Sequence, residues 1–196
     1  SWFSDFSLSH NREKIKELAS GQLKDEANAW FVGEPFKVFY DYKKEGIWQL
    51  GEEATAAANG QEPGDIKVQD VDGNGVITTD DRIIYSQRPD VTFGFNNTFN
   101  YKGFDLSVFL YARLGQWIAY DYNTTYRINA LENGGNVDYW TPENPTNAFP
   151  CPNKSKSYTQ VTYYSTLKYE DGSFFKIRDI TLGYTFKPEL LKHLNL

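Results

Sequence analysis

The sequence lacks methionine altogether and contains one cysteine, Cys151, among its 196 residues. A single cysteine cannot form a disulfide within the chain, so cysteine pairing says nothing about the cellular compartment. The absence of methionine, including at position 1, suggests a piece of a longer polypeptide. No run of 18 or more apolar residues occurs, which excludes a membrane-spanning helix. An outer-membrane β-barrel is not excluded, because its lipid-facing side chains alternate with polar ones.

Positive charge is also scarce. The chain has 20 Lys and Arg residues and 26 Asp and Glu residues, so its net charge is -6. Binding to nucleic-acid phosphates needs clustered cations, so nucleic acid is not expected as a partner. Aromatic residues, in contrast, make up 17% of the chain, which excludes intrinsic disorder. Because the mean hydropathy is only -0.61, these rings must be spaced among polar residues, as in alternating β-strands.

The clearest strand pattern lies between Val91 and Leu114. Successive side chains of a strand point to opposite faces. One face is apolar, with Val91, Phe93, Phe95, Phe99 and Tyr101 followed by Phe104, Leu106, Val108, Leu110, Ala112 and Leu114. The other face carries Thr92, Asn96, Asp105, Ser107 and Arg113. Lys102 and Gly103 between the two arms predict a two-residue hairpin turn. Both arms approach the roughly 9 to 11 residues of a membrane-crossing strand, and strands of soluble proteins usually have about 5 or 6.

Two further strands are predicted, near residues 2–11 and 173–187, beside those near 90–101 and 103–114. Long stretches, 12–89 and 115–172, separate them, and the part from Arg12 to Ala27 is compatible with a helix. Short turns at one end and long loops at the other are typical of transmembrane barrels, whose long loops face outside. The sequence therefore predicts an all-β chain that forms part of a transmembrane antiparallel β-barrel with long extracellular loops.

One motif for metal binding is specific. The segment from Asp70 to Asp81 follows the D-x-[DN]-x-[DN]-G pattern of calcium loops. Calcium is a hard cation that prefers oxygen ligands, and such loops offer them at positions 1, 3, 5, 7, 9 and 12. The corresponding residues are Asp70, Asp72, Asn74, Val76 through its carbonyl, Thr78 and Asp81. Position 12 is usually Glu, so Asp81 has a shorter reach.

The surroundings of this loop differ from those of an EF-hand. Gln61, Glu62, Pro63 and Gly64 cannot form the upstream helix that an EF-hand needs. Ile77, at position 8, is placed to anchor the loop to a hydrophobic neighbour. The alternative is an Asx-rich turn that holds no metal.

Other chemistry is weakly supported. The sequence has no nucleophile-elbow, P-loop or dinucleotide-binding motif, and its carboxylates form no specific pair, so we do not expect an enzyme. Four aromatic residues of the long loops are candidates for contact with a substrate or partner: Trp117, Tyr120, Tyr122 and Trp140. Such rings can stack on sugars, and the alternative is that they pack against one another.

Together these features resemble the C-terminal part of the barrel in SusC/RagA-type TonB-dependent outer-membrane transporters. The resemblance rests on Val32-Gly33-Glu34-Pro35, Gly46-Ile47-Trp48-Gln49, Pro63-Gly64-Asp65-Ile66 with the loop to Arg82, Val91 to Leu114, Tyr139 to Pro145, and Asp171 to Phe186. These segments occur in the expected order over nearly the whole chain.

The resemblance implies a barrel of about 22 strands in the outer membrane of a Gram-negative bacterium. It also implies import of oligosaccharides or peptides with a SusD-like surface lipoprotein, driven by the TonB complex through the N-terminal part of such a transporter. Outer-membrane lipid would cover the apolar face, and Thr92, Asn96, Asp105, Ser107 and Arg113 would line the passage. An alternative from another class is a secreted, calcium-stapled β-protein that binds glycans without spanning a membrane.

Overall fold

The computed structural model describes residues 1–19, 21–125, 135–155 and 160–188. The chain divides into two compact units. The first comprises Ser1–Lys14, Arg88–Gln116 and Asp171–Leu196, and the second comprises Ile15–Gln87 and Trp117–Glu170.

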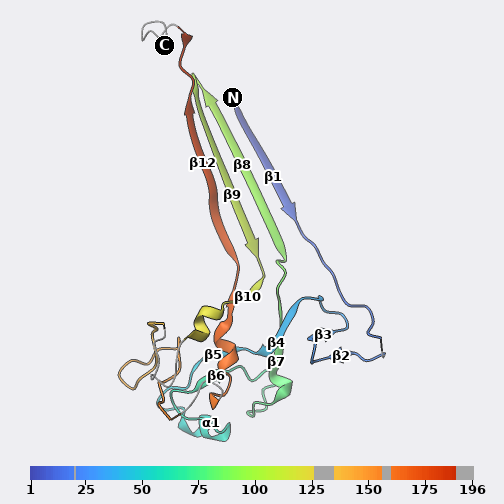
Figure 1. The fold of residues 1–196 in the computed structure, drawn as a ribbon, viewed down its shortest axis with the longest axis vertical. Coiled ribbons are helices and arrows are strands. Elements are labelled where there is room, and N and C mark those ends of the chain that lie inside the picture. The colour runs from blue at the N-terminus through green and yellow to red at the C-terminus, as the bar shows by residue number, and fades with distance from the viewer. Residues whose placement is uncertain (20, 126–134, 156–159, 189–196) are drawn as a thin grey trace. The chain divides into compact units, whose positions relative to one another are not determined.

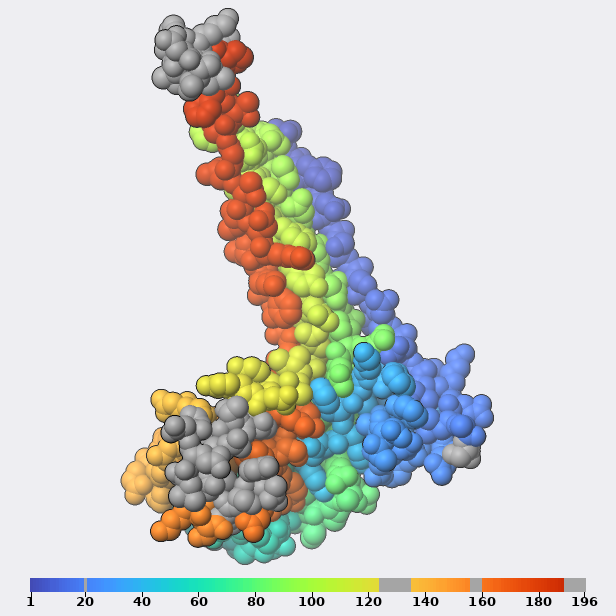
Figure 2. All heavy atoms as spheres, viewed as in Figure 1, coloured from blue at the N-terminus to red at the C-terminus, as the bar shows by residue number. Residues whose placement is uncertain are grey.

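The first unit is a four-stranded antiparallel sheet in the order β1-β8-β9-β12 (Figure 1). Its strands are β1 (Trp2–Ser9), β8 (Val91–Tyr101), β9 (Phe104–Leu114) and β12 (Phe174–Tyr184). They lie side by side in the space-filling view (Figure 2). Strands thus form at all four places where the alternation predicts them, with ends that differ by up to a few residues.

The turn between β8 and β9 is the predicted two-residue hairpin. Lys102 has φ 49° and Gly103 has φ 90°, so both residues of the turn are left-handed. This conformation matches the twist of the flanking strands, and glycine adopts it without a steric penalty.

The register of the sheet places all the apolar alternating positions on one face. Phe95 lies opposite both Phe6 of β1 and Leu110 of β9, and Leu110 lies opposite Ile177 of β12. Thr98 and Thr181 both lie opposite Ser107, on the other face. The polar positions therefore form a second, continuous face.

A β-bulge in β12 completes this division. Ile177 lies opposite Leu110 and Asp179 lies opposite Phe109, so Arg178 is the extra residue. Without the bulge, Phe175 and Ile177 would have the opposite parity to Ile180 and would lie on the polar face. The bulge returns both side chains to the apolar face, which simple alternation does not predict.

Both outer strands, β1 and β12, pair on one side only among the described residues. The apolar face is exposed, and Trp2 and Leu182 each retain 71% of their accessible area. The sheet does not close on itself.

The second unit consists of short elements. Its strands are β2 (Lys24–Asp25), β3 (Trp30–Phe31), β4 (Val38–Tyr42), β5 (Lys44–Ile47), β6 (Ile66–Val68), β7 (Arg82–Ser86), β10 (Trp117–Ala119) and β11 (Tyr169–Asp171). They pair as β2-β3, β4-β7, β5-β6 and β10-β11. Its helices are α1 (Glu53–Ala58) and the 3₁₀ turns η1 (Thr79–Asp81), η2 (Asp121–Thr125) and η4 (Tyr164–Lys168).

The second unit has its own hydrophobic core. Ile47, Ile66, Val68, Trp140, Val161 and Leu167 are buried in one cluster. This packing orders a region that the sequence shows only as long loops.

The expected helix between Arg12 and Ala27 is wrong for the described residues. Ile15 forms an isolated bridge with Val32, its N–H donates to the carbonyl of Glu34, and its own carbonyl accepts from Gly33. These extended contacts take the backbone groups that a helix would use. In the described part of the chain, no helix has the length and apolar character needed to cross a membrane.

Candidate functional site

The acidic loop between β6 and β7 brings three carboxylates together. Oxygen atoms of Asp70, Asp72 and Asp81 lie within 4.8 Å of one another. Asp70 accepts hydrogen bonds from the N–H groups of Gly73 at 2.8 Å and Gly75 at 2.7 Å. The chain can wrap around this carboxylate because Gly75 has φ 85°, which glycine tolerates.

Two further Asx turns continue the loop. Asp72 Oδ1 accepts from the N–H of Asn74 at 3.0 Å, and Asn74 Oδ1 accepts from the N–H of Val76 at 2.7 Å. Each of these turns joins residues two positions apart, so the local sequence determines the shape of the loop.

Asp81 is the buried member of the group. Its side chain is fully buried, and it accepts from the N–H groups of Thr78 at 2.7 Å and Val71 at 2.8 Å. These bonds, with that of Thr78 first, hold the pKa of Asp81 below its usual value. Asp81 therefore stays ionised despite its burial, and it ties the end of the loop to its beginning.

The flanks of the loop differ from EF-hand helices, as predicted. β6 precedes the Asp70–Asp81 segment, β7 follows it, and η1 lies within its last three residues. Ile77 packs against the core of the second unit, and its N–H donates to Asn59 Oδ1 at 2.8 Å. The predicted anchoring by Ile77 is confirmed.

The oxygen atoms that this loop offers are ligands of the type that a hard cation such as calcium prefers. Three carboxylates at this separation repel one another unless a proton or a cation compensates them. Val76 lies in the turn that its N–H closes with Asn74 Oδ1, and the carbonyl of Val76 is the predicted metal ligand. The hydroxyl of Thr78 accepts from the N–H of Asp80 at 3.2 Å, so it caps η1.

The four predicted loop aromatics fall into two groups. Tyr120 and Tyr122 are 49% and 57% exposed, and their ring centroids are 5.8 Å apart. Trp117 is partly buried against Tyr85. Trp140 is only 4% exposed and belongs to the hydrophobic core of the second unit, so the prediction that its ring contacts a substrate or partner is wrong.

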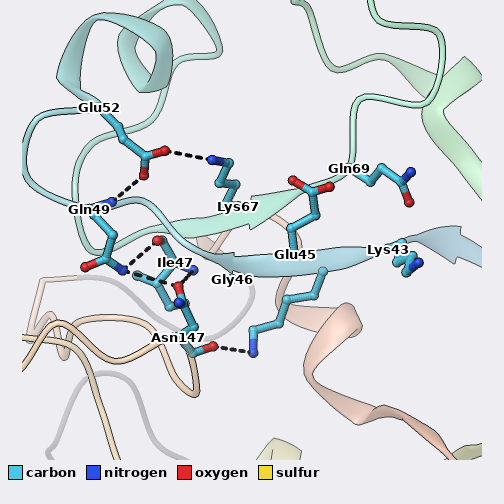
Figure 3. Close-up of a pocket in the computed structure, with 10 residues that line it drawn as sticks. Lys43, Glu45, Gly46, Ile47, Gln49, Glu52, Lys67, Gln69 and Asn147 are labelled. Atoms are coloured by element: carbon cyan, nitrogen blue, oxygen red, sulfur yellow. Dashed lines mark hydrogen bonds and ion pairs between the residues drawn. The ribbon is translucent and has the colours of Figure 1, made fainter.

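The structure also reveals a pocket of about 640 Å³ that the sequence does not indicate (Figure 3). Its walls come from β5, β6 and the segment around Asn147, and they comprise Lys43, Lys44, Glu45, Gly46, Ile47, Gln49, Glu52, Lys67, Gln69 and Asn147. Figure 3 shows Lys67 turned toward Glu52, and Gln49 turned toward Asn147. Asn147 is 100 positions from Ile47, to whose N–H it binds, so no local motif marks this site.

Two of the three lysines that line the pocket have polar partners. Lys67 Nζ lies 2.7 Å from Glu52 Oε1 and 4.6 Å from the ring centroid of Trp48. Lys44 donates to the carbonyls of Asn147 at 2.8 Å and Ala148 at 2.7 Å, and burial lowers its pKa. The pocket is a polar recess in which these contacts hold Lys44 and Lys67.

The predicted lumen-facing residues share the polar face of the sheet. Thr92 lies opposite Arg113. Asn96 lies opposite Phe109, and Phe109 lies between Ser107 and Tyr111 on the same face of β9. Ser107 Oγ donates to Asn96 Oδ1 at 3.3 Å. This face also carries Phe109 and Tyr111, which the sequence pattern alone leaves without a role.

Comparisons with known proteins agree with this architecture. No protein-family model matches the sequence. The chain is 32% identical over 212 residues to TonB-dependent receptor P3 of Formosa agariphila, covering 97% of this chain and 20% of that protein. It is 26% identical over 204 residues to TonB-dependent receptor SusC of Bacteroides thetaiotaomicron, covering 95% of this chain and 18% of SusC.

A solved structure of the RagAB peptide transporter superposes with a TM-score of 0.64 at 20% identity, covering 96% of this chain and 21% of that one. This likeness concerns the fold, and it confirms the all-β barrel architecture, which this segment alone does not close. The chain spans about a fifth of the length of the relatives it matches.

Proposed function

Because this chain belongs to the TonB-dependent receptors of the SusC and RagA type, of which it corresponds to one segment, we propose that it forms part of the wall of an outer-membrane nutrient importer. The observation that carries this proposal is the four-stranded sheet with one continuous apolar face. Three of its strands have 11 residues, a length suited to crossing a bilayer at a tilt. The membrane would be the outer membrane of a Gram-negative bacterium.

The open edges of the sheet support the same reading. Unpaired strand edges are very costly in lipid, because their backbone groups find no water there. We infer that β1 and β12 pair with further strands of the full-length receptor. The apolar face then meets lipid, and the polar face with Asn96, Ser107 and Arg113 lines the passage.

The second unit takes the extracellular side in this proposal. The Lys102-Gly103 turn is short, as periplasmic turns of such barrels are, and long loops lie outside. The proposed partners are a SusD-like lipoprotein over these loops and the TonB complex, acting through the N-terminal part of the receptor. Of the four predicted loop rings, Tyr120 and Tyr122 are exposed, and we propose them for contact with lipoprotein or substrate.

We propose that the substrate is an oligosaccharide or a peptide. The RagAB protein of similar fold is a peptide transporter, and exposed aromatic rings suit sugar faces as well. Similar proteins are named a receptor and a transporter, and the described residues form no constellation suited to chemistry on a substrate, so we propose transport as the role.

We further propose that the Asp70–Asp81 loop holds calcium. Asp70, Asp72 and Asp81 would supply carboxylate oxygens, Asn74 its amide oxygen and Val76 its carbonyl. Thr78 would act through its hydroxyl or through a water. The ion would fasten this loop against the core that Ile77 joins, and so stabilise the extracellular unit.

The proposed function is tested by cell fractionation and uptake with the full-length receptor. We expect the receptor in the outer-membrane fraction, co-purifying with a lipoprotein, and we expect deletion of its gene to abolish growth on one oligosaccharide or peptide source. Release of the intact protein into the medium would favour the secreted glycan-binding alternative and contradict the proposal.

A further inference from the structure

Three cations and three aromatic rings gather on the polar face of the sheet where β9 and β12 pair. We call this set the cation-ring patch; it consists of Phe109, Tyr111 and Arg113 of β9 and Phe174, Lys176 and Arg178 of β12. Phe174 lies opposite Arg113 and Lys176 lies opposite Tyr111. All six residues belong to one compact unit.

The cations lie on the rings. The guanidinium carbon of Arg178 is 5.8 Å from the ring centroid of Phe109 and 5.6 Å from that of Tyr111. Lys176 Nζ is 5.3 Å from the ring centroid of Phe174. The rings contact one another as well, with centroids 6.4 Å apart for Phe109 and Tyr111 and 5.9 Å apart for Tyr111 and Phe174. Cation–π attraction therefore holds both long side chains in place.

The β-bulge is what brings Arg178 to this face. Ile177 pairs with Leu110 and Asp179 pairs with Phe109, so Arg178 has no partner residue in the ladder. In a regular strand, residue 178 would share the apolar face with Ile180, and Ile177 would lie on the polar face. The bulge keeps Ile177 on the apolar face and still directs Arg178 to the rings, since bulges re-aim side chains.

The three cations keep their hydrogen-bonding capacity. Within the described residues, Arg113, Lys176 and Arg178 form no ion pair. Asp179 is the carboxylate next to the patch, and it accepts a hydrogen bond from the Thr181 hydroxyl at 2.9 Å. Positive charge exceeds negative charge here, although the chain as a whole has a net charge of -6.

Chemistry of this kind recognises anions. A guanidinium offers a planar fork of N–H donors that matches a carboxylate or sulfate, and an ammonium adds a compact charge. Because the rings already hold Lys176 and Arg178, little side-chain freedom is lost when an anion binds.

We propose that the cation-ring patch is a binding site for carboxylate groups of the transported substrate, which is therefore anionic. This inference rests on the proposed function, because the patch faces the passage only if the sheet is a barrel wall. The patch meets the anionic groups as the substrate enters the passage, and neutral molecules gain nothing from it.

The test is calorimetric binding to the purified full-length receptor. The probes are a glutamate oligopeptide with its glutamine counterpart, and an oligogalacturonate with its methyl-esterified, uncharged counterpart. We expect one acidic probe to bind about tenfold or more tightly than its uncharged match, with an affinity that falls as salt rises. Which acidic probe binds separates a peptide from a glycan as the source of the anion.

Variants connect this binding to the patch. The double variant K176Q/R178Q should weaken binding of the acidic probe about tenfold or more, because charge-assisted hydrogen bonds are lost. K102Q is the matched control: Lys102 Nζ also lies on a ring, 5.2 Å from the centroid of Tyr101, but at the β8–β9 turn. It removes a positive charge and should leave binding unchanged. Unchanged assembly of all variants in the outer membrane excludes a folding defect.

Failure of this inference differs from failure of the proposed function. Equal affinity for acidic and uncharged probes, binding of neither acidic probe, or equal effects of K176Q/R178Q and K102Q would each overturn the inference. In any of these cases the receptor can still fractionate with the outer membrane and support uptake. Only loss of those two properties contradicts the proposed function.

Discussion

Trp140 Nε1 donates a hydrogen bond to Gln49 Oε1 at 2.9 Å, and this bond joins positions 91 residues apart. The ring is 4% exposed and packs in the core with Ile47 and Ile66. Gln49 in turn donates to the carbonyl of Ile47 at 2.8 Å. Trp140 therefore fastens the later loop segment to the strand pair β5-β6, and its role in the second unit is structural.

Replacement of Trp140 should destabilise the second unit strongly. Trp140→Ala removes a large buried ring and its hydrogen bond, and such core truncations cost about 3–5 kcal/mol. Thermal unfolding of the full-length receptor, followed by near-ultraviolet circular dichroism, measures the effect. Tyr120→Ala is the control, because Tyr120 is 49% exposed and exposed substitutions stay within about 0.5 kcal/mol. Equal shifts for the two variants would contradict a core role for Trp140.

The sequence predicts the sheet better than the loops, for a physical reason. Alternation reports which face of a strand is buried, so Val91 to Leu114 reveal their strands and turn directly. The bulge at Arg178 breaks the parity that alternation assumes, and only the pairing with β9 shows it. Phe175 and Ile177 could have signalled it, since both are apolar and both have the opposite parity to Ile180.

The candidate sites divide in the same way. The acidic loop is predictable because its Asx turns join residues that are close in sequence, such as Asp72 and Asn74. The pocket at Gly46 depends on Asn147, and the core depends on Trp140, so neither has a local signature. Aromatic composition predicts that the loops are ordered, but it cannot separate a buried Trp140 from an exposed Tyr122.

Gly64 should tolerate no side chain, because of its neighbours. Its φ is 95°, and a Cβ built there would lie 2.8 Å from Cys151 Cβ and 2.9 Å from Trp140 Cε3. Gly64→Ala therefore adds steric overlap to the backbone strain of about 1–2 kcal/mol for a left-handed residue. Gly51→Ala isolates the strain, since Gly51 has φ 93° with nothing within 4 Å. The melting temperature of the receptor should fall further for Gly64→Ala, and equal decreases would show that the predicted overlap is absent.

Calcium removal should loosen the acidic loop. If the loop binds calcium, the ion stabilises the folded state by about 2.7 kcal/mol at a concentration one hundred times its dissociation constant. Chelation should then increase protease cleavage between residues 60 and 90, and added calcium should reverse it. Asp70→Asn should reduce this protection by calcium. Asp80→Asn removes a charge from the adjacent exposed position, outside the three-carboxylate group, and should not. Cleavage that is indifferent to calcium would favour an Asx-rich turn without metal.

The two faces of the sheet should respond differently to arginine. Leu110 lies opposite Phe95 and Ile177 on the apolar face, whereas Ser107 lies opposite Thr98 and Thr181 on the polar face. Leu110→Arg should lower the free energy of unfolding in lipid vesicles by roughly 2–4 kcal/mol if the position is near mid-bilayer, because the charge must enter the lipid. Ser107→Arg extends into the passage, where water solvates the guanidinium, and should cost much less.

Urea titration of the full-length receptor in vesicles, with the folded fraction read from heat-modifiable gel mobility, compares the two variants. Equal tolerance at Leu110 and Ser107 would contradict a lipid-facing apolar face, and with it the assignment of this sheet to a barrel wall.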